Sequence, residues 1–533
     1  MKKPWLIGLL FVGVGVWIIL APVNAQESDL GDNTQNPNEE TTLETSEIDL
    51  GVSQILTATT SITITRTRDD LEIESLAPQS PNQELGSDFM VSSMGPYLDP
   101  DYDALNPAVA YNSQNNQYLV VWSGSDDIIG EYEIWGQRVN AATGAQIGTD
   151  FQISFVGTAD DPAIDAEDPA VAYNSATNEY LVVWSADHYA DGDFEIWGRR
   201  INAATGGLLG SMMRISVMGP GVDPDYDALN PAVAYNSTEN QFLVVWEADD
   251  DTAPLVNNEF EIWGRRLSAS GEWLDADIVR LSEMGGLGDA NYDAQTPSVA
   301  YNTLNNEYML VWSGDKSAYD AVNDEFEIWG QRLNASLGKM GAAGFRISDV
   351  GTNADPDRDA YDPSIAYSSG NNQYLVVWEG DDYDDNMYDV LGQRLEANGI
   401  ATGSNDFYLS SVSGGTNSNY DALNPAVTYD RVNHEYLVVW QDDVLNVGEF
   451  EIWGQRISAS DGSQSGYNTR MSDMGPDGDA SYIAQTPALA YSGVSNNQFL
   501  IVWSGDNSID GEFDIWGQRW TNGYKINLPL VIR

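Results

Sequence analysis

Short apolar runs separated by polar clusters recur along most of this chain. In the first copy the runs are PAVAYN (107–112), YLVVW (118–122), YEIWGQRV (132–139) and DFQIS (150–154). Valine, isoleucine and aromatic residues dominate the runs, and Asn, Gly, Asp and Ser fill the intervals, which is typical of β-strands joined by turns. No window of useful length shows the period of an amphipathic helix. The pattern predicts an all-β chain built from units of four strands.

The four-strand unit occurs seven times. Its register is marked by a tryptophan that ends the second strand and by the arginine of a Gly-(Gln/Arg)-Arg motif in the third. The tryptophans are Trp122, Trp184, Trp246, Trp312, Trp378, Trp440 and Trp503, and the arginines are Arg138, Arg200, Arg266, Arg332, Arg394, Arg456 and Arg519. Successive tryptophans are 62 to 66 residues apart. Seven such units predict a seven-bladed β-propeller of four-stranded blades.

The two ends of the repeat region complement each other. DFMVSS (88–93) resembles the fourth-strand runs but precedes the first full copy, whereas the last copy stops after its third strand at Trp520. We therefore expect the N-terminal strand to complete the last blade and close the ring. An open β-solenoid or a string of small sandwiches would need capping units or linkers, and the sequence shows neither.

The repeated tryptophans and arginines are interpreted as structural. Blades pack face to face, so a strand between two neighbours is apolar on both sides, and Leu391 replaces the second tryptophan of the fifth copy as a packing position would allow. A tryptophan-lined cofactor site is the disfavoured alternative. A buried guanidinium needs partners, so we expect carboxylates or carbonyls around the repeated arginine.

Three segments lie outside the expected propeller, which spans 86–523. Residues 1–25 have a basic start, an apolar run and a Val-x-Ala site, which predicts a secretory signal peptide; an uncleaved anchor is the alternative, because the run is nearly long enough to span a bilayer. Residues 26–85 are acidic, rich in Thr and Ser and poor in aromatics, which predicts a disordered spacer. The tail 524–533 is apolar and basic, and its sequence indicates no role.

The charge and the missing residue types exclude several functions. The chain carries 82 acidic and 23 basic residues, a net charge of −59, which repels nucleic acid and anionic lipid and favours cations. There is no cysteine, so thiolate metal sites, a cysteine nucleophile and a lipoprotein anchor are excluded, and His188 and His434 alone cannot build a multi-histidine zinc site.

We expect a monomeric bacterial protein, secreted or held at the cell surface, that does not insert into the membrane after signal cleavage.

The acidic residues concentrate in two classes of loop. Second-to-third loops such as SGSDDIIGEYE and EADDDTAPLVNNEFE, and interblade loops such as DPDYDALNP, contain most of the acid. In an up-down-up-down blade these two classes share one end of the ring. The opposite end carries short Asn- and Gly-rich turns, so one acidic end is expected.

An aspartate recurs just before the proline that opens each innermost strand. It is Asp103, Asp165, Asp227, Asp293, Asp359 and Asp421, with Ile483 in the seventh copy. Three copies extend it to alternating carboxylates, namely Asp99, Asp101 and Asp103; Asp223, Asp225 and Asp227; and Asp355, Asp357 and Asp359. Ca²⁺ takes six to eight oxygen ligands from such loops, so these nine residues are candidate Ca²⁺ ligands. For the recurring aspartate alone, an Asx-type turn is the favoured interpretation.

Aromatic residues beside this aspartate suggest a binding surface. The candidate ligand-binding residues are four tyrosines that we expect to be exposed, Tyr102, Tyr226, Tyr292 and Tyr420, with Asp293 and Asp421. Rings beside carboxylates suit sugars, so we expect a non-enzymatic propeller that binds a glycan or protein partner through an acidic, Ca²⁺-stabilised end. The alternative is an extracellular polysaccharide-degrading enzyme. No catalytic residue is predicted, because the carboxylates come in repeated copies and no Gly-x-Ser-x-Gly or phosphate loop is present.

The layout DPAVAYNSATNEYLVVWSADHYADGDFEIWGRRINAATGG…RIS (168–216) resembles the repeats of TolB-like (WD40-like) bacterial β-propellers. Those repeats also run from a Pro-opened inner strand, through a hydrophobic strand, to an (Asp/Glu)-Ile-aromatic strand. The resemblance covers all seven copies as a strand pattern, although the copies here are about 20 residues longer and lack the Ser-Pro-Asp-Gly hairpin. It implies the propeller fold and a role in protein interaction, and it carries over no catalytic residue.

Overall fold

A computed structural model describes the propeller region with gaps in its loops. The described residues are 83–95, 102–125, 131–157, 163–189, 192–219, 226–249, 258–285, 291–316, 325–350, 358–381, 387–410, 420–445, 447–506 and 511–521. The expected signal peptide, nearly all of the expected spacer and the C-terminal tail lie outside these residues. Within the described ranges, the one helix is the short 3₁₀ turn η1 (Gly493–Ser495), and no helix could cross a membrane.

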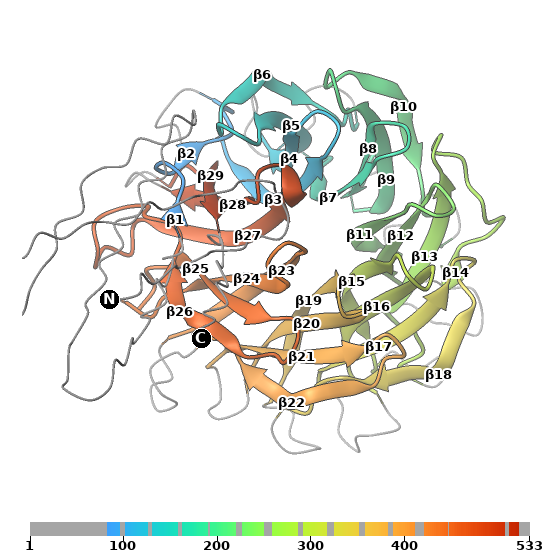
Figure 1. Ribbon diagram of the computed structural model, residues 1–533. Helices are drawn as coiled ribbons and strands as arrows, with labels where there is room; N and C mark the ends of the chain where they lie inside the picture. The colour runs from blue at the N-terminus through green and yellow to red at the C-terminus, as the bar shows by residue number, and fades with distance from the viewer. Residues whose placement is uncertain are drawn as a thin grey trace, which may run out of the picture. The chain divides into compact units, whose positions relative to one another are not determined.

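Seven antiparallel sheets form the blades of a propeller around a central axis (Figure 1). Each blade places its first strand innermost, where it contacts the first strands of both neighbours. The first strands are β3 (Ala104–Asn112), β7 (Ala166–Asn174), β11 (Ala228–Asn236), β15 (Ala294–Asn302), β19 (Ala360–Ser368), β23 (Ala422–Asp430) and β27 (Ile483–Tyr491). The second strands are β4 (Gln117–Gly124), β8 (Glu179–Ala186), β12 (Gln241–Ala248), β16 (Glu307–Gly314), β20 (Gln373–Gly380), β24 (Glu435–Asp442) and β28 (Phe499–Asp506).

The outer half of each blade consists of the third and fourth strands. The third strands are β5 (Glu133–Asn140), β9 (Glu195–Asn202), β13 (Glu261–Ser268), β17 (Glu327–Asn334), β21 (Asp389–Glu396), β25 (Glu451–Ser458) and β29 (Asp514–Thr521). Six fourth strands follow them in sequence: β6 (Gln146–Gln152), β10 (Leu208–Arg214), β14 (Val279–Arg280), β18 (Lys339–Arg346), β22 (Ala401–Tyr408) and β26 (Gln464–Arg470). The sheet order of these six blades confirms the predicted four-stranded unit.

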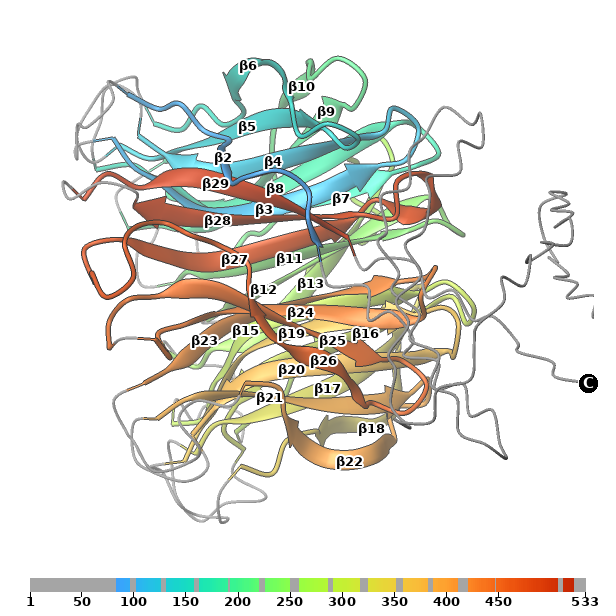
Figure 2. The ribbon, with the colours of Figure 1, turned by 60° about the vertical axis from the view of Figure 1, so that its left-hand side comes forward.

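The N-terminal segment supplies the outer edge of the seventh blade, as predicted. Two short strands, β1 (Gln83–Glu84) and β2 (Phe89–Met90), pair antiparallel with β29, and Figure 2 shows β2 beside β29. Phe89 lies opposite Gly517. The pairing begins at Gln83, inside the stretch that composition assigns to the spacer. Both ends of the repeat region therefore share one sheet, which closes the ring.

The hydrophobic core lies between blades. Each apolar cluster joins the second strand of one blade to its neighbour; for example, Trp184 packs with Leu119 and Val121 of the preceding blade. The second strands are buried along nearly their whole length because both of their faces are covered. The seven marker tryptophans are all fully buried and Leu391 is 1% exposed, which confirms their assignment to the core.

The repeated arginine of the third strand binds groups of the next blade or of its own second strand. Arg138 Nη1 donates to the carbonyl of Ala204 at 2.7 Å, and Arg394 Nη1 donates to the carbonyl of Ser460 at 3.1 Å. Arg456 pairs with Glu435 at 3.3 Å. Carbonyl and carboxylate partners are the expected ones for a guanidinium between packed blades.

Candidate functional site

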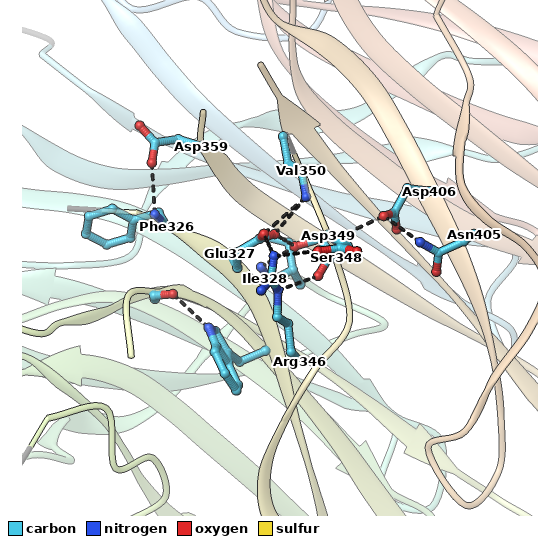
Figure 3. Close-up of polar contacts among 12 residues, drawn as sticks. Phe326, Glu327, Ile328, Arg346, Ser348, Asp349, Val350, Asp359, Asn405 and Asp406 are labelled. Carbon is cyan, nitrogen blue, oxygen red and sulfur yellow. Dashed lines mark hydrogen bonds and ion pairs between the residues drawn. The ribbon is translucent and has the colours of Figure 1, made fainter. Parts of the chain in front are cut away.

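The recurring interblade aspartate ties two blades together. In each of its six copies one carboxylate oxygen accepts a hydrogen bond from a backbone N–H at the start of the preceding blade's third strand, at 2.8 to 3.1 Å. Figure 3 shows one of these bonds, from Phe326 N–H to Asp359. The aspartate accepts a hydrogen bond, as expected, but its donor is not in a local Asx turn. The donor is 33 residues away in five copies and 410 residues away for Asp103.

A second aspartate, three residues after the marker tryptophan, stands beside the first. It accepts the backbone N–H of the interblade aspartate at four junctions, at 2.7 to 2.9 Å, through Asp187, Asp249, Asp315 and Asp443. Burial, followed by the charges of Asp249 and Asp193, raises the pKa of Asp227 to about 6. Burial and the charge of Asp443 likewise raise the pKa of Asp421. Carboxyl groups are thus paired at four junctions of the acidic loop end, which is the end formed by the interblade and second-to-third loops.

A third acidic residue opens the third strand and fastens it to the fourth. In the fourth blade Glu327 accepts hydrogen bonds from Ser348 Oγ, from the Val350 N–H and from Arg346 (Figure 3). Burial is the largest influence on Glu327 and raises its pKa to about 8, against the opposing effect of Arg346. We call this set of bonds between the third and fourth strands the latch. It was not predicted from the sequence, although the (Glu/Asp)-Ile-Trp and Arg-Ile-Ser runs repeat in register.

The nine candidate Ca²⁺ ligands are only partly placed by the structure. Asp99, Asp101, Asp223, Asp225, Asp355 and Asp357 lie outside the described residues. Asp103, Asp227 and Asp359 are described, and each is anchored by a backbone N–H. Within the described part of the chain, no group of three or more His, Asp or Glu side chains is arranged to hold a metal ion. The Ca²⁺ site therefore stays a prediction.

The four candidate ligand-binding tyrosines are half-buried, where exposed side chains were expected. Tyr226, Tyr292, Tyr420 and Tyr102 each pack against an interblade hydrophobic cluster. Tyr102 and Tyr226 lie so close to Gly95 and Gly219 that a Cβ there would be 2.2 and 2.5 Å from the ring. Part of each ring therefore serves packing. The two aspartates grouped with these tyrosines, Asp293 and Asp421, hold the Phe260 and Tyr388 N–H groups.

The central channel, by which we mean the space enclosed by the seven first strands, is lined near the acidic loop end by a ring of residues that precede proline. Each first strand has a register shift there, and the residue before proline adopts a left-handed conformation with φ between 49° and 52°. The seven residues are Asn106, Asp168, Asn230, Thr296, Asp362, Asn424 and Thr486. With their prolines they line a cavity of about 330 Å³, which we call the channel neck. Left-handed Thr and Asp residues are strained, so neighbouring bonds must hold this geometry.

Buried carboxylates supply some of those bonds. Glu247 accepts the Thr296 N–H at 2.5 Å and Asn230 Nδ2 at 3.0 Å, and Glu379 accepts the Asn424 N–H at 2.7 Å. Burial raises the pKa of Glu247 to about 7, and burial together with the charge of Asp362 raises the pKa of Glu379 to about 8. Carboxyl groups with pKa values raised toward neutral pH therefore stand behind the neck.

A ring of seven tyrosines surrounds the opposite mouth of the channel. They end the first strands, and we call them the tyrosine ring: Tyr111, Tyr173, Tyr235, Tyr301, Tyr367, Tyr429 and Tyr491. Five of them line a cavity of about 500 Å³ together with Arg431 and several small residues. The spacing of one tyrosine per unit is visible in the sequence, but its position at the axis required the strand order.

Comparisons with known proteins give only distant likenesses to solved structures. No protein-family model matches the chain, and no curated protein matches it. Among solved structures it is similar to the GH93 α-L-arabinofuranosidase of Fusarium graminearum with arabinobiose (12% identity, 81% of this chain, 98% of that chain, TM-score 0.44). It is also similar to polysaccharide lyase Uly1 (9%, 84%, 95%, 0.47) and to the β-propeller domain of the Trilobed protease from Pyrococcus furiosus (8%, 81%, 98%, 0.42). Likenesses of this degree carry no information about activity, and the TolB-like resemblance stays a prediction. The chain is a seven-bladed β-propeller.

Proposed function

We propose that this chain is an exported, non-enzymatic β-propeller that binds a glycan or protein partner through its acidic loop end. The observation that carries the proposal is the near-equivalence of six blade junctions. The same carboxylate takes the same backbone N–H at each of them, within 0.3 Å in distance. A repeated surface of this kind suits a partner that contacts several blades, whereas general acid–base catalysis requires one pair of groups with different pKa values at one place.

Calcium is part of this proposal. The triple-aspartate loops end in Asp103, Asp227 and Asp359, and the backbone bond of each fixes one end of its loop. Two further carboxylates precede each of them at alternate positions, and the net charge of −59 favours cation uptake. Bound Ca²⁺ would neutralise crowded charge and stiffen these loops for partner binding.

The metal part of the proposal is tested by thermal unfolding. We expect 1 mM-scale Ca²⁺ to raise Tm and EDTA to lower it, because a cation that binds only the folded state stabilises it by mass action. The matched variant replaces Asp355 and Asp357 by Asn, and it should respond less to Ca²⁺ than the wild type. Identical melting curves in Ca²⁺ and in EDTA would remove the metal from the proposal.

The binding part is tested at single junctions. A glycan-array and pull-down screen, with and without Ca²⁺, identifies the partner. Asp293→Asn and Asp421→Asn should then weaken binding by similar small factors, because each changes one of six near-equivalent junctions. If instead the protein degrades a polysaccharide, and one junction variant alone abolishes turnover, the enzyme alternative replaces this proposal.

A further inference from the structure

The tyrosine-ring mouth differs in chemistry from every other part of the channel. Its cavity of about 500 Å³ lies within the range of ~300–1,000 Å³ that is usual for small-ligand pockets. Eight hydroxyl groups line it, from five ring tyrosines and from Ser113, Ser369 and Thr428. Among the residues that line it there is no carboxylate, although the chain has 82 acidic residues. The one charged lining group is Arg431.

The tyrosines are held in place before any ligand arrives. In six of the seven, the hydroxyl lies 2.6 to 3.0 Å from an asparagine Oδ1 five or six residues later, and Tyr429 contacts His434 Nδ1 at 2.8 Å. Tyr301 also has Thr238 Oγ1 as an acceptor at 2.6 Å. Each ring also packs against the aromatic residue that faces it on the second strand, with centroids 5.1 to 5.5 Å apart. A fixed aromatic wall loses little entropy on binding.

Arg431 breaks the sevenfold symmetry of this mouth. Two residues after the ring tyrosine, five copies have a small hydroxyl residue, the sixth has Arg431 and the seventh has Gly493. The glycine makes room for the guanidinium, since a Cβ at Gly493 would lie 2.7 Å from Arg431 Nη2. The sixth and seventh blades thus differ from the rest in a complementary way.

Arg431 has no hydrogen-bond or ion-pair partner among the described residues, although its charge acts on the neighbouring Tyr111 and Tyr491. The other arginines within the described residues each donate to a carbonyl or pair with a carboxylate, for example Arg456 with Glu435 and Arg358 with Asp381. No hydrogen bond or ion pair joins the Arg431 guanidinium to a described residue, and the side chain is exposed. An arginine held in a pocket without a protein partner can pair with a carboxylate through two parallel hydrogen bonds.

We infer that the tyrosine-ring mouth binds an acidic sugar, namely a hexuronic acid unit, alone or at the end of a polysaccharide. Arg431 takes the carboxylate, the lining hydroxyls exchange hydrogen bonds with the sugar hydroxyls, and the tyrosine rings pack against the C–H groups of the pyranose. This site lies at the other end of the channel from the acidic loop end. Its failure would therefore leave the proposed function untouched, and the reverse also holds.

The test uses the full-length protein and titration calorimetry with galacturonic acid, trigalacturonate and the neutral galactotriose. We expect binding of the acidic ligands and at least 10-fold weaker binding of galactotriose. Preference for the trimer over the monomer assigns the site to a chain end, and equal affinity assigns it to the free sugar. No measurable binding of either acid, or equal binding of a triglutamate peptide, overturns the inference.

Two variants test separately whether uronate binding depends on the charge of Arg431 and on the position of its guanidinium. Arg431→Ser restores the residue found at this place in other blades, so the fold should tolerate it, and uronate affinity should fall at least 10-fold. Gly493→Asn keeps the charge but crowds the guanidinium, and asparagine tolerates the left-handed φ of 66°; it should also weaken binding. Lys339→Ser removes the same charge at a distance and should change nothing. Unchanged affinity in Arg431→Ser, with an unchanged Tm, overturns the inference.

Discussion

The fourth blade and the seventh blade attach the third strand to the outermost strand in the same way, but with different segments of the chain. In the fourth, the latch joins Glu327 to Ser348 and Arg346 within one stretch of 22 residues. In the seventh, Asp514 takes the hydroxyl of Ser92 at 2.7 Å across 422 residues of sequence. Ser92 Oγ in turn accepts the Ile515 N–H at 2.8 Å, as Ser348 Oγ accepts that of Ile328 at 2.7 Å.

The two latches differ in the number of further donors to the carboxylate. The interior latch has an arginine and the Val350 N–H as further donors to its carboxylate, whereas the closing latch shows Ser92 as the donor to Asp514. The seventh blade also replaces one continuous fourth strand by two short ones, β1 and β2. The closing blade therefore copies the repeat geometry with fewer bonds, which makes it the place where the ring should open first.

The largest expected effect comes from the marker tryptophans. Trp184→Ala in an interior blade and Trp503→Ala in the closing blade should each cost about 3–5 kcal/mol of unfolding free energy, because both side chains are fully buried between blades. Denaturant titrations followed by circular dichroism measure the cost. A near-neutral Trp503→Ala beside a costly Trp184→Ala would show that the closing blade packs loosely.

A smaller effect is expected from the latch serines. Ser348→Ala and Ser92→Ala each leave a buried carboxylate with one donor fewer, at a cost of about 1–3 kcal/mol. The change at Ser92 should be the more harmful of the two, because Glu327 keeps Arg346 as a partner. Hydrogen exchange of the β29 amides reads out the opening of the ring directly. Equal costs at the two serines would contradict the weaker support that we assign to the closing latch.

The smallest and most gradual effect is the pH dependence. Burial raises the pKa of Asp514 from 3.8 to about 6 and that of Glu327 from 4.5 to about 8. The folded state then keeps protons that the unfolded chain releases, so the unfolding free energy decreases as pH rises from about 5 to about 8. Urea midpoints at pH 5, 6.5 and 8 measure this slope.

The two latches should contribute to different parts of that slope. Asp514→Asn should flatten it below about pH 6.5, and Glu327→Gln should flatten it up to about pH 8, because each variant removes the group that titrates there. A midpoint that increases steadily from pH 5 to pH 8 would show that these carboxyls are ionised in the folded protein.

The fold could be predicted from the sequence because seven copies show the same pattern. One YLVVW run could belong to many β-folds, but its sevenfold repetition with the Gly-(Gln/Arg)-Arg marker predicts the number of blades and their register. The DFMVSS strand before the first copy predicts how the ring closes. The core position of Trp184 could be predicted in the same way. An apolar residue that recurs in the second strand of each blade must face a neighbouring blade.

The site was less accessible, because its chemistry depends on partners distant in sequence. The six interblade aspartates were recognised, but their N–H donors belong to another loop, so a local turn was the natural interpretation. The tyrosine ring was hidden for a related reason: Tyr111 and Tyr429 look like ordinary strand residues until the ring brings them to one axis. Arg431 was visible only as a departure from the repeat.

The pairing of β2 with β29 also sets the order of events as the chain is made. Phe89 leaves the ribosome long before its partner Gly517, and at about 5–20 residues per second the wait is on the order of half a minute. Until then the growing protein is an open arc with two unpaired sheet edges. Such edges invite pairing with other chains, so we expect the unfinished protein to be prone to aggregation until its last blade emerges.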